Sequence, residues 1–264
     1  MFDALYIGAT GMQAQQLNVD TIANNLANVN TTGFKKGRIG FSEMVAKDPT
    51  RLASIQANAE AGLLAPSVRA GAGVSVASLS KLFDMGDLKK TDSALDVTVQ
   101  GDGFMEVVMP DGTTAYTRGG TIKINKDGHL ATQAGYALKP SISIPDGAQA
   151  LTVSADGRVQ VRVPGQTTPA EIGKLDLVRF ANPQGLAAQG DSLYRSSSAS
   201  GEAISARPSE DGMGTFAQGY LEGSNVKMVE EMVNLMVAQR TYEANVKVVQ
   251  AADDIMGMVN GLRR

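Results

Sequence analysis

The N-terminal end of the chain carries side chains in a strict seven-residue repeat, most of them apolar. Two rows form the repeat, one of Leu5, Met12, Val19 and Leu26 and the other of Gly8, Gln15, Ile22 and Val29. On a helix, such rows make one narrow stripe that a second helix can cover. The spacing therefore predicts a helix over about residues 3–30, roughly 40 Å long, that packs as one strand of a coiled coil.

The C-terminal end carries a matching repeat of Met228, Leu235, Tyr242, Val249 and Met256. We expect a second helix over about residues 225–260, with Ser224 or Asn225 as its N-cap, because short polar side chains accept hydrogen bonds from the free N–H groups there. The two repeats predict that the ends of the chain pair with each other. The predicted assembly interface comprises Leu5, Met12, Val19, Ile22, Leu26, Val29, Met228, Met232, Leu235, Tyr242, Val246, Val249 and Met256.

The middle of the chain has a different pattern, in which short runs of alternating apolar and polar residues are separated by Asp-Gly pairs. The runs cover 74–82, 94–99, 104–108, 121–125, 129–132, 151–153, 159–163 and 175–180. The pairs begin at Asp102, Asp111, Asp127, Asp146, Asp156 and Asp211. An Asp-Gly pair between alternating runs is a strong signal for a β-hairpin. The pattern predicts a compact antiparallel β-domain.

These elements predict an α+β fold in which the N- and C-terminal helices pair as a coiled coil, with an inserted antiparallel β-domain and an extended connector. Gly33 is expected to end the first helix in a left-handed conformation. The predicted parts are the N-terminal helix at 1–32, the first part of the connector at 33–73, the β-domain at 74–205, the connector return at 206–224 and the C-terminal helix at 225–264.

Composition argues against an enzyme, a cofactor site or a metal site. The chain has no Cys and one histidine, His129, which leaves no thiolate site and no cluster of histidine ligands. The Asp-Gly pairs lack the spacing of a calcium loop. A net charge of −3 makes nucleic acid an improbable partner. No apolar run reaches the roughly 18 residues of a membrane span, and the N-terminus lacks the features of a secretory signal.

Several apolar residues of the two predicted helices lie off the coiled-coil seam, including Ile7, Leu17, Val229, Val233, Met236 and Val237. Leaving each of them in water forgoes roughly 1.5 kcal/mol or more of burial free energy. Copies that stack side by side would bury them, and a repeated contact that does not close gives a helical tube. We therefore expect a tubular polymer with helical ends inside and β-domains outside.

Long motifs at both ends resemble those of the flagellar rod and hook family. The run ANNLANVNTTGFKK at 23–36 is similar to the family's N-terminal signature, and the run at 220–256, which begins YLEGSNVKM, is similar to its C-terminal signature. Between them, DGTTAYTRGG at 111–120, KDGHLAT at 126–132 and GYAL at 135–138 resemble the family's middle domain. The polar residues of these motifs that we expect at the interface are Asn24, Asn25, Asn28, Gln239, Arg240 and Asn245.

The resemblance implies a structural subunit of the distal rod, a self-assembling drive shaft that crosses the periplasm and transmits torque from motor to hook. It implies as partners further copies of the chain, the proximal rod and the hook, the bushing rings and the flagellar export apparatus, with no small-molecule substrate. It also implies a place in the basal body and export without a cleaved signal peptide. An insertion at about 46–64 resembles an extra stretch of the distal-rod members.

Three alternatives remain open at this point. A proximal-rod or hook-type subunit of the same family would share the motifs at both ends. A carbohydrate-binding or hydrolytic β-domain with helical appendages would need a pocket with converging polar groups. A trimeric adhesin or phage-fibre subunit would need one long parallel coil, whereas the matched repeats here lie at opposite ends of the chain.

Overall fold

The computed structural model describes residues 2–45, 71–145, 147–148, 150–164, 168–210 and 212–261. The expected insertion at 46–64 lies outside these residues. The chain forms two compact units. We call residues 1–24, 38–79 and 229–264 the helical unit, and residues 25–37 and 80–228 the β-unit.

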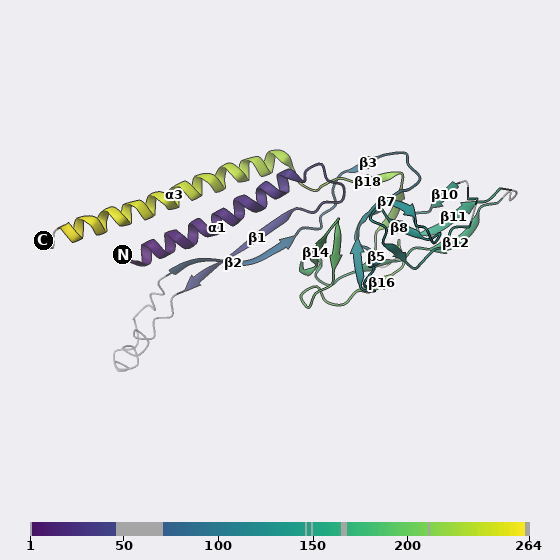
Figure 1. Ribbon diagram of the computed structural model, residues 1–264, viewed down its shortest axis with the longest axis horizontal. Helices are drawn as coiled ribbons and strands as arrows, with labels where there is room; N and C mark the ends of the chain where they lie inside the picture. The colour runs from purple at the N-terminus through teal and green to yellow at the C-terminus, as the bar shows by residue number, and fades with distance from the viewer. Residues whose placement is uncertain are drawn as a thin grey trace, which may run out of the picture. The chain divides into compact units, whose positions relative to one another are not determined.

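The helical unit is built on two long helices, α1 (Phe2–Ala27) and α3 (Met228–Gly261), which run side by side (Figure 1). At 1.5 Å per residue they are about 39 and 51 Å long. Two glycines of α1 allow α3 to approach it closely. A Cβ atom at Gly8 would lie 2.6 Å from Cγ2 of Val249, and one at Gly11 would lie 2.9 Å from the amide nitrogen of Asn245. The order of these contacts shows that the helices are antiparallel.

The helix ends differ from the predicted ones. α1 stops at Ala27, before the expected end at about residue 30, since the N–H groups of Asn28 and Val29 bond carbonyls only three residues earlier, at 3.1 and 3.3 Å. Asparagines in this stretch compete with the helix for backbone hydrogen bonds. Gly33 has the expected left-handed φ of 68°, but it lies well beyond α1 and does not end it.

Two strands complete the helical unit, β1 (Gly37–Val45) and β2 (Gly71–Lys81), which form a two-stranded sheet. The hydroxyls of Ser42 and Ser75 bond across it at 2.7 Å. The N–H of Val74 donates to the hydroxyl of Thr10 at 3.4 Å, which ties β2 to α1. The alternating run at 74–82 is therefore a strand as predicted, but its partner is β1 and not a strand of the β-domain.

The β-unit is an antiparallel β-structure. Its strands are β3 (Leu88–Lys90), β4 (Asp96–Gln100), β5 (Met105–Val108), β6 (Thr114–Thr117), β7 (Gly119–Ile124), β8 (Leu130–Thr132), β9 (Ala137–Lys139), β10 (Ala150–Val153), β11 (Arg158–Arg162), β12 (Ala170–Lys174), β13 (Leu177–Arg179), β14 (Ala187–Gly190), β15 (Leu193–Arg195), β16 (Ile204–Ala206), β17 (Thr215–Gln218) and β18 (Tyr220–Glu222). The largest sheet has the order β14-β15-β6-β5-β9-β8-β7-β4-β17, and smaller sheets join β10-β11-β12, β13-β16 and β18-β3.

Three of the predicted Asp-Gly turns close hairpins. Gly112, Gly128 and Gly157, with φ of 77°, 76° and 82°, lie between β5 and β6, β7 and β8, and β10 and β11. The left-handed conformation at these positions costs little only for glycine. The predicted connector return at 206–224 contains two strands of the β-unit, because β17 pairs with β4 and β18 pairs with β3.

Two apolar clusters fill the β-unit. The larger one lies among strands whose valines and leucines are fully buried, including Val97, Val107 and Leu130. The smaller one is aromatic and consists of Phe83, Phe104, Tyr116, Phe180 and Tyr194 with Val178 and Leu186. Its rings meet edge to face, with centroids 4.8 Å apart for Phe83 and Tyr194. Such pairs contribute about 0.5–1.5 kcal/mol beyond the area that they bury.

The hairpin of β14 and β15 turns through two residues that are poorly suited to it. Asp191 and Ser192 have φ of 49° and 57°, as a type I′ turn requires. We expect Asp191→Asn with Ser192→Gly to stabilise the β-unit by about 1 kcal/mol, because Asn-Gly adopts this turn with less strain. A rise in the urea midpoint of the far-UV circular dichroism signal would show it.

The matched control for this variant is Asp191→Asn alone. It keeps the exposed hydrogen bond from the Ser192 hydroxyl to the carbonyl of Thr32, 3.3 Å long. A midpoint unchanged in both variants would mean that the turn is unstrained.

Candidate assembly interface

On α1, the structure places the predicted seam residues on the less exposed side of the helix. Ile22 is buried, and Leu5, Met12, Val19 and Leu26 are half-buried. Val29 lies in the turn that follows the helix. Gly8 and Ala14 are buried as well, so the side that α1 turns away from water includes small residues.

On α3, the predicted rows divide. Leu235, Val246, Val249 and Met256 are half-buried, whereas Met228, Met232 and Tyr242 are exposed. The half-buried residues Leu235, Val249 and Met256 lie beside a more shielded row. That row consists of Glu231, Ala238, Asn245 and Ala252. These residues also recur every seven positions. Asn245 is one of the motif residues expected at the interface, whereas Glu231, Ala238 and Ala252 lie outside the predicted seam.

A set of large apolar side chains on α3 faces water, and we call it the apolar ridge. It consists of Met228, Val229, Met232, Val233, Met236 and Val237. Val229 is 75% exposed, the highest value in the ridge. Tyr6, Ile7 and Leu17 of α1 are exposed in the same way. Contiguous apolar surface on a soluble chain marks an interaction site.

The motif asparagine Asn25 has a structural role at the end of α1. Its buried side-chain amide donates to the carbonyl of Gly37 at 2.9 Å and accepts from the N–H of Gly37 at 2.8 Å. This pair of bonds fixes the start of β1 to the end of the helix. Asn28 accepts a bond from the Thr31 hydroxyl at 3.1 Å, whereas Asn24 is exposed.

The motif residues of α3 lie on different sides of that helix. Gln239 and Arg240 are exposed, and Arg240 pairs with Glu243 at 3.1 Å. Asn245 is half-buried where Gly11 approaches it. Asn245 is therefore the residue of this motif that contacts α1.

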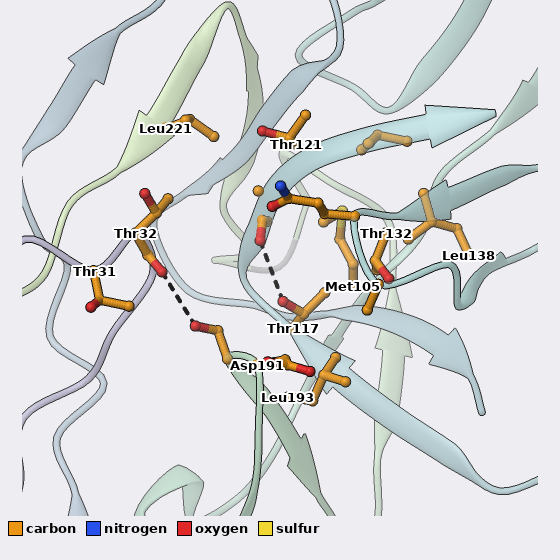
Figure 2. Close-up of a pocket in the computed structure, with 16 residues that line it drawn as sticks. Thr31, Thr32, Met105, Thr117, Thr121, Thr132, Leu138, Asp191, Leu193 and Leu221 are labelled. Atoms are coloured by element: carbon orange, nitrogen blue, oxygen red, sulfur yellow. Dashed lines mark hydrogen bonds between the residues drawn. The ribbon is translucent and has the colours of Figure 1, made fainter. Parts of the chain in front are cut away.

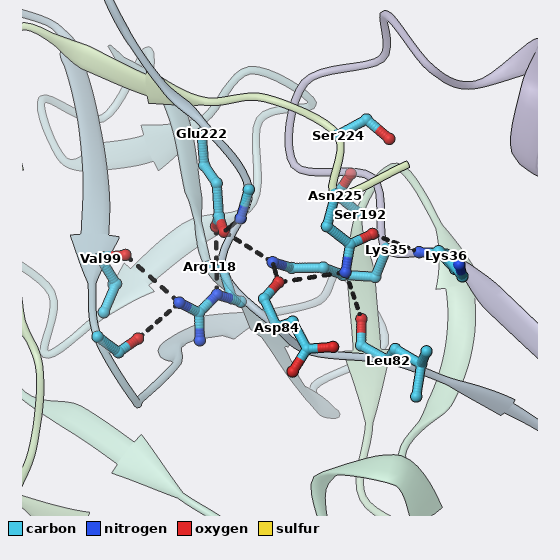
Figure 3. A network of polar contacts seen from close by, with 12 residues as sticks. Lys35, Lys36, Leu82, Asp84, Val99, Arg118, Ser192, Glu222, Ser224 and Asn225 are labelled. Atoms are coloured by element: carbon cyan, nitrogen blue, oxygen red, sulfur yellow. Dashed lines mark hydrogen bonds and ion pairs between the residues drawn. The ribbon is translucent and has the colours of Figure 1, made fainter. Parts of the chain in front are cut away.

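A buried charge network joins the two stretches of chain that form the β-unit (Figure 3). The ammonium group of Lys35 donates to a carboxylate oxygen of Glu222 at 2.7 Å, and the Arg118 guanidinium donates to the other oxygen at 3.2 Å. Lys35, Glu222 and Arg118 are 0%, 3% and 4% exposed. No local pattern in the sequence marks these three residues as a group.

Backbone groups complete the coordination of this network. Lys35 also donates to the carbonyl of Asp84 at 2.7 Å, and the N–H of Gly86 donates to Glu222 at 2.9 Å. Arg118 donates to the carbonyl of Gly101 at 2.6 Å. Burial lowers the pKa of Lys35, and the Glu222 carboxylate opposes that shift. Buried charges persist in a fold only when they are paired and hydrogen-bonded in this way.

The sequence predicted that Asn225 could cap α3, but its side chain instead extends the charge network. Its side chain accepts from the N–H of Lys36 at 2.8 Å and donates to the carbonyl of Leu82 at 2.9 Å. The helix consequently begins only at Met228. The segments that carry the two terminal motifs are thus bonded to each other through Lys35, Lys36, Glu222 and Asn225.

The β-unit also has a cleft of about 540 Å³, rich in hydroxyl groups (Figure 2). Its lining includes Thr31, Thr32, Thr117, Thr121 and Thr132 together with the apolar residues Met105, Leu138 and Leu193. Asp191 is the one carboxylate among the lining residues, which include no histidine. These groups do not make a general acid–base pair.

Within the described part of the chain, no three His, Asp or Glu side chains gather closely enough to hold a metal ion. The helices found there lack the combination of length and apolar character that is required to cross a membrane.

Models of three flagellar protein families match the chain. They are described as flagella basal body rod protein, matching residues 5–35, flagellar hook protein FlgE/F/G D1 domain, matching residues 98–161, and flagellar basal body rod FlgEFG protein C-terminal, matching residues 217–262. The matches fall on the two terminal segments and on the β-unit.

Known relatives are similar over the full length. The flagellar basal-body rod protein FlgG of Borreliella burgdorferi is 42% identical over 267 residues, which cover 100% of both chains. FlgG of Caulobacter vibrioides is 42% identical over 98% of this chain and 99% of its own. FlgG of Buchnera aphidicola subsp. Schizaphis graminum is 40% identical over 99% and 100%. The chain therefore belongs to the FlgG family of flagellar basal-body rod proteins and is a structural subunit of the flagellum rather than an enzyme.

Proposed function

We propose that the chain self-assembles into the helical tube of the distal rod and that the apolar ridge of α3 is a contact between copies. The observation that carries this proposal is the exposure of the ridge along the N-terminal part of α3. Burying an exposed Val or Met side chain contributes about 1.5–3 kcal/mol. A few such side chains per contact are enough to favour a polymer over dilute monomers.

Within each subunit, we propose that α1 and α3 pair as a coiled coil along the predicted seam of α1 and the half-buried seam residues of α3, which exclude Met228, Met232 and Tyr242. The antiparallel course of the helices and the close contacts at Gly8 and Gly11 support this pairing. A polar residue at a seam position fixes register at a cost in stability, and Asn245 opposite Gly11 is suited to that role. In the tube, the helical ends would line the inside and the β-domains the outside.

Membership of the family supports a further proposal on the surroundings of the subunit. We propose that the polymer contacts the proximal rod at one end and the hook at the other, and rotates within bushing rings in the periplasm. We also propose that each subunit reaches this place through the flagellar export apparatus without losing a signal peptide.

Val233→Asp tests the role of the ridge. We expect this variant to raise the concentration at which the purified chain polymerises at least tenfold, because a charge cannot be buried there without a partner. Pelleting at increasing protein concentration, with electron microscopy of the pellets, measures the effect. The β-unit should unfold at an unchanged urea concentration, since Val233 lies on the helical unit.

Gln250→Asp is the matched control, because it adds the same charge to α3 at an exposed position outside the ridge. It should polymerise like the unaltered chain. Equal polymerisation by Val233→Asp, or a closed oligomer of fixed size in place of filaments, would contradict the proposal.

A further inference from the structure

Three methionines of the apolar ridge form a row along α3. Met228, Met232 and Met236 are spaced by four residues, which places them on one side of the helix over successive turns. They are 48%, 54% and 62% exposed. Half of the ridge is thus made of thioether side chains that water reaches.

Exposed thioethers are the most readily oxidised side chains that the composition offers, and the three in this row are the exposed ones that lie in the ridge. The chain has no Cys and no Trp, so neither a thiol nor an indole competes for an oxidant. Met105 and Met213, in contrast, are buried in the core of the β-unit. The same molecule therefore contains exposed methionines and shielded ones, and the latter serve as an internal reference.

We propose that the Met228–Met232–Met236 row is a site of reversible oxidation by hydroperoxides, and that its oxidation state decides whether a subunit can join the polymer. The proposal rests on the proposed function, in which the ridge is a contact between copies. It adds a chemical modification and a control to that surface.

The reaction is a two-electron oxygen transfer. A lone pair of the methionine sulfur attacks one oxygen of hydrogen peroxide, the O–O bond breaks, and an S–O bond forms. The other oxygen leaves with the protons as water. The thioether is oxidised to a sulfoxide and the peroxide is reduced to water, so no further reactant is needed. A dithiol-dependent sulfoxide reductase reverses the change.

The consequence follows from where the oxygen is added. A thioether is flexible and apolar, and it adapts to irregular apolar surfaces. A sulfoxide is polar and accepts hydrogen bonds, so burying it in an apolar contact without a partner is unfavourable. Three sulfoxides on one side of α3 would place this penalty at the centre of the ridge. Polymerised subunits would be protected, because the contact covers the sulfurs.

The test begins with the purified full-length chain and hydrogen peroxide. Peptide mass mapping over time should find one added oxygen on Met228, Met232 and Met236 before Met105 and Met213 react. The oxidised chain should need at least tenfold more protein to polymerise. Methionine sulfoxide reductases A and B with dithiothreitol should restore polymerisation, because the two enzymes reduce both sulfoxide epimers.

The triple variant Met228→Leu, Met232→Leu and Met236→Leu provides the control, since leucine preserves volume and apolar character. It should polymerise equally well before and after peroxide, although the exposed Met85 and Met258 remain oxidisable. Loss of polymerisation by the peroxide-treated triple variant would overturn the assignment to this row. So would normal polymerisation of the unaltered chain when the row is fully oxidised. Failure of the untreated chain to polymerise would instead overturn the proposed function, and this inference with it.

Discussion

Replacing Glu222 with glutamine is expected to lower the free energy of unfolding of the β-unit by about 3–5 kcal/mol. The substitution preserves size but removes the negative charge between Lys35 and Arg118. Both cations are almost fully shielded from water, at 0% and 4% exposed. They would remain buried without a counter-charge, and the interior cannot replace the solvation that they lost.

Urea unfolding followed by far-UV circular dichroism measures this effect. Glu106→Gln is the matched control, because it breaks another Lys–Glu pair of the same unit, whose Lys139 is 57% exposed. A pair of this kind contributes about 0–1 kcal/mol. If Glu222→Gln were no more destabilising than Glu106→Gln, the buried network would not be holding the β-unit together.

The second large effect is expected at alkaline pH, where ionisation of Tyr194 should destabilise the β-unit by about 3 kcal/mol. Burial is the main cause that raises the pKa of Tyr194, from an ordinary 10.0 to about 12, and the Glu222 carboxylate raises it further. The unfolded chain therefore loses the phenolic proton at a lower pH than the folded chain. This contribution is complete below pH 10 and is lost as the pH rises through about 12.

Unfolding of the unaltered chain and of Tyr194→Phe, compared at pH 9 and pH 12, isolates this contribution from all other titrations. The phenylalanine variant should lose about 2 kcal/mol less stability between the two pH values, because Tyr194 is still half protonated in the folded chain at pH 12. Tyr220→Phe, at a half-buried position on β18, is the control for the loss of a tyrosine hydroxyl elsewhere in the β-unit. Parallel losses in all three proteins would mean that the Tyr194 hydroxyl reaches water in the folded state.

Local signals in the sequence predicted the elements whose structure is decided locally. The Asp-Gly pairs at 111, 127 and 156 close hairpins because the turn chemistry is contained in two residues. The long helices follow from repeats that extend over many turns. Strands such as β6 and β15 were missed because they are short and gain their stability from neighbours in the sheet.

The features that depend on distant residues could not be derived in this way. Lys35 and Glu222 are 187 positions apart, and neither stands out in its own segment until the fold brings them together. Asn225 has the composition of a helix cap, yet it bonds Lys36 and Leu82. The shielded row of Glu231, Ala238, Asn245 and Ala252 shows that small and polar residues can make a helix contact, which a repeat of large apolar side chains does not reveal.

The β-unit is assembled from two separate stretches of chain, 25–37 and 80–228, and Lys35 comes from the shorter one. This arrangement limits how such a protein can be recombined during evolution. A crossover that transplanted only the longer stretch into a homologue would deliver Glu222 and Arg118 without their own lysine. A single exchange that keeps Lys35 and Glu222 from the same parent gene has to include both stretches. The DNA that encodes residues 38–79 between them is then exchanged as well.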